Sequence, residues 1–141
     1  KNNFGIWFSA KGKGVNEPGY YLHIQPGKSF IAGGYWMPEA AHLKLIRQEI
    51  DYNGMQFREI INASDFKKFC ALNQEEKLKK APSGYEVGHP EIEFLKLKSF
   101  TASHSFSDKE FTSKNAIESI LKPITAMYDF KLFLHHALDE G

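Results

Sequence analysis

Apolar and polar residues alternate in two stretches near the start of the chain. In the first, Phe4, Ile6 and Phe8 occupy every second position, which is the period of a β-strand. The second stretch, residues 19–37, is interrupted at Pro26-Gly27, where proline fits the first central position of a turn and glycine tolerates the positive φ of the next. The pattern predicts a strand near residues 4–9 and a hairpin at 19–37.

A two-residue turn at Pro26-Gly27 fixes which residues of the hairpin share a face. It places Leu22 opposite Ile31 and Tyr20 opposite Gly33 on one side. A longer loop with a bulge would change the partners but keep the alternation within each strand. The glycine pair within the second strand indicates that another group approaches the backbone there. The other face then carries Tyr21, His23, Phe30, Ala32, Gly34 and Trp36.

Helical patterns fill most of the remaining chain. They predict helices over residues 38–52, 56–61 and 64–72, with Ser64 as the N-cap of the third. Ser107 and Glu110 have the spacing of a capping box, and a helix from about residue 113 is expected to break near Asp129. Residues 95–101 alternate again and predict a strand. The fold class is therefore α+β, with a small antiparallel or mixed sheet packed by helices.

Composition limits the functions to consider. The chain has 141 residues, a net charge of +1 and one cysteine. Its length predicts one domain over residues 1–141, and its balanced charge gives no indication of nucleic acid as a partner. The lone cysteine, together with the lack of a long apolar run, predicts a cytoplasmic protein with no membrane partner. The histidines lack metal-ligand spacing, so we expect neither a metal nor a cofactor.

Arg47 lies in the apolar stripe of the predicted helix 38–52, between Leu43 and Ile50 in projection. A guanidinium directed toward a core needs a partner, because burying it unpaired is costly. It either forms an ion pair or extends to the surface, or it binds an anion at the edge of a pocket. The loop over residues 81–90 brings two further candidates, Tyr85 and His89.

Several short motifs together resemble a known family. They are Lys1-Asn2-Asn3-Phe4-Gly5, residues 19–24, residues 33–38, Ile46-Arg47, and residues 82–85 with His89-Pro90. Their order and spacing are similar to those of bacterial and fungal proteins catalogued as domain of unknown function twenty-four sixty-one. The resemblance runs over nearly the whole chain and implies the C-terminal two thirds of the family domain, without its N-terminal part. The exposed face where that part packs is then expected to be apolar or covered by another chain. The family implies no catalytic residues.

Three functions remain open. The first is a module that binds a small molecule or anion in a pocket on the 19–37 hairpin, with Tyr21, His23 and Trp36 above Gly33 and Gly34. Arg47 or the loop carrying Tyr85 would close this pocket. The second is an enzyme with His23 or His89 as general base and Arg47 as the anchor of an anionic substrate. The third is an interaction module that forms a homo-oligomer.

Overall fold

A computed structural model of the chain describes residues 2–12 and 16–139. Within these ranges, one antiparallel sheet has the strand order β1-β2-β3-β5-β4. The strands are β1 Phe4–Phe8, β2 Gly19–Ile24, β3 Phe30–Tyr35, β4 Ala71–Leu72 and β5 Phe100–Ser105. The helices are α1 Ala40–Tyr52, α2 Gly54–Asn62, α3 Ser64–Phe69, α4 Ile92–Leu95, α5 Asp108–Thr112, α6 Ala116–Ala126 and α7 Tyr128–Asp139. The α+β prediction is confirmed.

The hairpin of β2 and β3 has the predicted register. Leu22 pairs with Ile31, and Tyr20 pairs with Gly33. The turn is tight, because the amide of Lys28 donates to the carbonyl of Gln25 over 2.9 Å and Gly27 has a φ of +75°. A positive φ at the second central position is that of a type II turn. The alternative of a longer, bulged loop is therefore not adopted.

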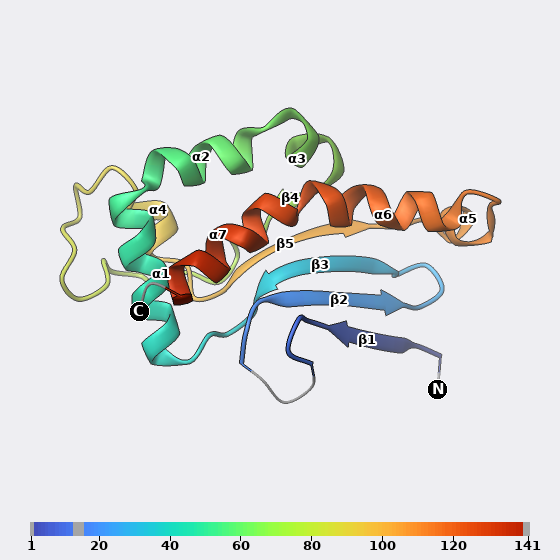
Figure 1. Cartoon of the computed structure of the whole chain (residues 1–141), viewed down its shortest axis with the longest axis horizontal. Helices are drawn as coiled ribbons and strands as arrows, with labels where there is room; N and C mark the ends of the chain where they lie inside the picture. Colours follow the sequence, from blue (N-terminus) through green and yellow to red (C-terminus); the bar gives the residue numbers. More distant parts are fainter. Residues whose placement is uncertain (1, 13–15, 140–141) are drawn as a thin grey trace.

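Helices cover one face of the sheet (Figure 1). The helices α6 and α7 run along β3, and α1 and α2 pack against α7. Side chains from the strands and helices meet there in a fully buried layer that includes Ile31, Phe100, Ala102, Met127 and Phe130. The hydrophobic core thus lies between the sheet and the helices, while the residues alternating with this layer face away from it.

The predicted strand at 95–101 is displaced. Residues Ile92–Leu95 form α4, and β5 begins only at Phe100. Leu95 and Leu97 are both fully buried, which explains their alternation with lysines in the sequence. Their carbonyls accept hydrogen bonds from Arg47. The backbone of residues 96–98 pairs with residues 76–78 through an isolated bridge between Lys77 and Leu97.

Smaller differences occur at helix ends. Ala71–Leu72, expected in a helix, pairs with β5 as β4. Ser64 is the first residue of α3 rather than its N-cap, and α1 starts at Ala40, two residues after Pro38. The predicted capping box of Ser107 and Glu110 is confirmed. The expected break near Asp129 falls at Met127, between α6 and α7.

Candidate functional site

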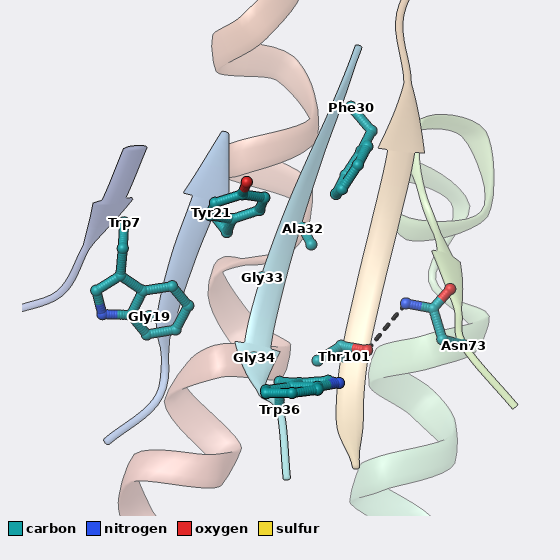
Figure 2. A pocket seen from close by; sticks show the side chains of 10 residues that line it. All are labelled: Trp7, Gly19, Tyr21, Phe30, Ala32, Gly33, Gly34, Trp36, Asn73 and Thr101. Atoms are coloured by element: carbon teal, nitrogen blue, oxygen red, sulfur yellow. Dashed lines mark hydrogen bonds between the residues drawn. The ribbon is translucent and has the colours of Figure 1, made fainter. Parts of the chain in front are cut away.

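The face of the sheet opposite the helices carries a shallow cavity of about 470 Å³. Figure 2 shows its side chains projecting from the sheet, with the helices behind the strands. Four aromatic residues, from β1, β2, the first residue of β3 and the residue after its end, surround a centre made of small residues. The lining consists of Trp7, Gly19, Tyr21, Phe30, Ala32, Gly33, Gly34, Trp36, Asn73 and Thr101.

Two of the aromatic rings lie directly on glycine backbone. A Cβ atom at Gly19 would lie 2.8 Å from Cζ2 of Trp7, so the indole occupies the space that a side chain would fill. The ring of Tyr21 covers Gly5 in the same way. Between these rings and Phe30, the surface is formed by Ala32 and Gly34, which have little or no side chain. The absence of bulk at these positions creates the cavity.

Trp36 is held at the edge of the cavity by a strained turn. The next residue, Met37, has a φ of +46°, a left-handed conformation that costs a residue other than glycine about 1–2 kcal/mol. The amide of Met37 donates to Oγ of Ser99 over 2.8 Å, and Ser99 is buried. The indole itself is 66% exposed. The hydrogen bond to the buried Ser99 thus fixes the backbone next to Trp36, while the large apolar ring of Trp36 stays exposed to solvent.

The side of the cavity nearest β4 is polar. Nδ2 of Asn73 donates to Oγ1 of Thr101 over 2.9 Å, and Oγ of Ser103 donates to Oδ1 of Asn73 over 3.1 Å. The amide of Asn73 retains a second N–H and a second lone pair for another partner. A smaller cavity of about 200 Å³ continues beyond this point. It is lined by Trp36, Asn73, Glu75, Glu76, Ser99 and Thr101.

The structure brings together four of the residues that the sequence indicated, namely Tyr21, Trp36, Gly33 and Gly34. Sequence reasoning did not find the other six lining residues as parts of a site; they are Trp7, Gly19, Phe30, Ala32, Asn73 and Thr101. The alternation in residues 4–9 and 30–36 assigned Trp7 and Phe30 to a face. Their approach to Asn73 and Thr101, however, depends on the pairing of β3 and β4 with β5, which no local pattern reveals.

His23 lies next to the cavity but does not line it. Its Nε2 lies 2.8 Å from Oε1 of Gln25, and its Nδ1 lies 3.0 Å from Oη of Tyr21. The side-chain oxygen Oε1 of Gln25 can only accept a hydrogen bond, so Nε2 of His23 carries the proton and Nδ1 accepts from the phenol of Tyr21. Both ring nitrogens are engaged, which leaves none for a general base.

Arg47 and Tyr85 lie at a different place. They line a cavity of about 750 Å³ between α1 and the loop at residues 82–85. Nε of Arg47 donates to the carbonyl of Leu95 over 2.7 Å, and Nη2 donates to that of Leu97 over 3.2 Å. Burial lowers the pKa of Arg47, and the nearby phenol of Tyr85 opposes this shift. The prediction that Arg47 or this loop closes the hairpin pocket is therefore wrong, because the guanidinium is bound to backbone carbonyls on the other side of the protein's core.

His89 fastens the same loop to α1. Its Nε2 donates to Oδ1 of Asp51 over 2.6 Å, and its Nδ1 accepts from the amide of Glu91 over 2.9 Å. Tyr85 meets the imidazole edge to face, with 5.9 Å between ring centres. As with His23, neither nitrogen is free. The interactions of His89 are those of a residue that holds a loop in place.

Neither a candidate metal centre nor a candidate membrane-spanning helix occurs in the described residues. In residues 2–12 and 16–139, no three His, Cys, Asp or Glu side chains gather as a metal would require. None of the helices in these ranges has the length and apolar character needed to cross a bilayer.

Comparison with known proteins identifies the family but not a function. No curated protein and no solved structure matches the chain. A family profile, described as "Conserved hypothetical protein (DUF2461)", matches residues 1–133. The match covers nearly the whole chain and is not confined to a C-terminal part of it. The chain therefore belongs to the conserved hypothetical protein family DUF2461.

Proposed function

We propose that this protein binds a small organic molecule on the open face of its sheet. The observation that carries the proposal is the cavity of about 470 Å³ between Trp7, Tyr21, Phe30 and Trp36. Its volume falls within the range of about 300–1,000 Å³ that is usual for small-molecule sites. Aromatic walls with a few polar groups at one end are the usual composition of such sites.

The shape and chemistry of the cavity favour a flat, largely apolar ligand. Its floor is formed by Ala32 and Gly34, so a ring could approach the backbone of β3 closely. Trp7 and Trp36 are partly exposed on either side of this floor and would bury apolar area when a ligand enters. Asn73 would orient one polar group of the ligand through its remaining hydrogen-bonding capacity.

The lining gives no support to the anion that we expected as a ligand. It contains neither lysine, arginine nor histidine, and Arg47 is bound to carbonyls elsewhere. The enzymatic alternative also gains no support, since both histidines considered as general bases are fully hydrogen-bonded. The homo-oligomer stays a prediction, because nothing in a single chain tests it.

Filling the floor of the cavity tests the proposal. N-phenyl-1-naphthylamine is an uncharged probe whose fluorescence increases in an apolar site. We expect it to bind the wild-type protein with one-to-one stoichiometry, and we expect Ala32→Leu to weaken its binding at least tenfold by occupying the floor.

Ala41→Leu provides the matched control. Ala41 lies exposed on α1 and away from the cavity, so this variant should bind the probe like the wild type. Equal affinity of all three proteins for the probe, or no binding to the wild type, would contradict the proposed function.

A further inference from the structure

We infer that the ligand carries a cationic group, an amine or a quaternary ammonium, which lies against Trp36 beside Glu75 and Glu76. This inference rests on the proposed function and specifies the chemical class of the ligand. It follows from the small cavity at the polar end of the site, from the charges around it, and from the position of the indole.

The two cavities adjoin each other at Trp36. The smaller cavity of about 200 Å³ shares Trp36, Asn73 and Thr101 with the larger one. A ligand whose apolar body lies on Ala32 and Gly34 can therefore extend past Trp36 into the second space. That space is several times the roughly 30 Å³ that one water molecule occupies in the liquid, and it is large enough for a small substituted ammonium group.

The charged side chains that line the two cavities are all acidic. The linings include Glu75 and Glu76 and no basic residue. Neither glutamate forms an ion pair within the part of the chain that the structure describes, since the neighbouring Lys77 is directed to Glu93, with Nζ 3.2 Å from Oε1. An anion would meet repulsion in this space, whereas a cation would find charges of the opposite sign.

The indole of Trp36 adds a second source of attraction for a cation. Tryptophan has the most favourable ring for cation–π contact, at distances within about 6 Å of the ring centre. Its ring is largely exposed in the free protein, so it can be covered by a ligand. The turn at Met37 and Ser99 holds the backbone next to it, which reduces the ordering that binding requires.

A charged compound and its uncharged isostere separate this inference from the proposed function. The probes are benzyltrimethylammonium, neopentylbenzene, which has the same shape without the charge, and benzoate. Binding is followed by NMR through the indole N–H signals of Trp7 and Trp36, and the signal of Trp7 reports on binding to Trp36→Leu. We expect the cation to bind at least tenfold tighter than its isostere, and benzoate not to bind.

Variants then test whether Glu75, Glu76 and Trp36 cause the preference for the cation. The double variant Glu75→Gln/Glu76→Gln should remove most of the preference for the cation, and Trp36→Leu should weaken binding of both compounds. Glu59→Gln, at an exposed position of α2, is the control and should change neither affinity. All these positions are exposed, and circular dichroism verifies that the variants fold.

Three other outcomes would contradict the inference of a cationic ligand. If the isostere binds as tightly as the cation, the proposed function stands and the inference of a cationic ligand is wrong. The inference is also wrong if N-phenyl-1-naphthylamine binds but benzyltrimethylammonium does not. If none of these compounds binds, both proposals fail together.

Discussion

The two faces of β3 are built from alternate residues of one strand, yet the face toward the helices is filled and the opposite face is hollow. On the helix side of β3, Ile31 is fully buried, and a Cβ at Gly33 would lie 2.9 Å from Sδ of Met127. On the open side, Ala32 and Gly34 form the floor of a cavity of about 470 Å³. Small residues occur on both faces, and what differs is whether a large partner fills the space above them.

The strand register creates this difference. Gly33 pairs with Tyr20, whose ring lies 5.4 Å from that of Phe8, so aromatic side chains fill the helix side. Gly34 pairs with Gly19, and the backbone of both lines the cavity. A Cβ atom at Gly34, which has a φ of +122°, would point into the core and lie 2.9 Å from the ring of Phe130. Closely packed interiors tolerate few voids. The space on the opposite face is open to solvent, so this rule does not apply to it, and it is the space in which we propose that a ligand binds.

The largest expected effect comes from truncating one residue on each face. Ile31→Ala should lower the free energy of unfolding by about 2–5 kcal/mol, because it leaves a cavity in a fully packed layer. Trp7→Ala should cost less than about 1 kcal/mol, since the indole is already 44% exposed. Urea titrations of both variants measure the difference. Equal losses would show that the open face carries as much of the stability as the core.

The dependence of the free energy of unfolding on alkaline pH tests the burial of the helix side further. Burial raises the pKa of Tyr20, on the helix side, to about 12, with a contribution from the phenol of Tyr128. The unfolded chain releases this proton near its ordinary value of about 10. The folded state therefore keeps a proton that the unfolded state has lost, and stability falls as pH rises from about 10 to about 12. Two pKa units correspond to about 3 kcal/mol.

Tyr20→Phe isolates this contribution. Burial also raises the pKa of Cys70 to about 12, so the wild type loses stability from more than one group. The difference in unfolding free energy between wild type and Tyr20→Phe should decrease by about 2 kcal/mol between pH 9 and pH 12, where the folded phenol is itself half ionised. A difference that is constant with pH would show that the phenol is not desolvated.

The smallest expected effect concerns the turn at the edge of the cavity. Met37→Gly should raise the free energy of unfolding by about 1 kcal/mol, because glycine adopts a φ of +46° without strain. The same change should weaken binding of N-phenyl-1-naphthylamine, since Trp36 would lose its fixed position. Thermal denaturation and the probe titration measure the two effects. A destabilised variant would show that Met37 is not strained.

The parts of the fold that local chemistry determines were predictable. The Pro26-Gly27 turn fixed the register of β2 and β3, and the capping box at Ser107 was visible in the sequence. The strand predicted at 95–101 lies farther along the chain, at Phe100–Ser105, because two buried leucines with a lysine between them have the same pattern in a strand and in a short helix followed by a turn. Only contacts with α1, some 50 positions away, distinguish these structures.

Only the part of the candidate site that lies on β2 and β3 was predictable from the sequence. Alternation placed Tyr21 and Trp36 on the correct face, but it could not show that Asn73 and Thr101 lie across β3 from Tyr21 and beside Trp36. Arg47 was misassigned because a helical projection identifies the side of a helix and not the atoms opposite it. Its partners are the backbone carbonyls of Leu95 and Leu97. Every residue has a backbone carbonyl, so a sequence pattern cannot identify these two as partners.

The glycines beneath the rings of Tyr21 and Trp7 have a consequence for any survey of substitutions. Methyl groups at Gly5 and Gly19 would meet those rings and push them outward, which would reshape the walls of the cavity without altering any residue of its floor. Loss of binding in such variants would therefore report on the tilt of a neighbouring ring. In this protein, two positions that have no side chain determine how two of the largest side chains are presented.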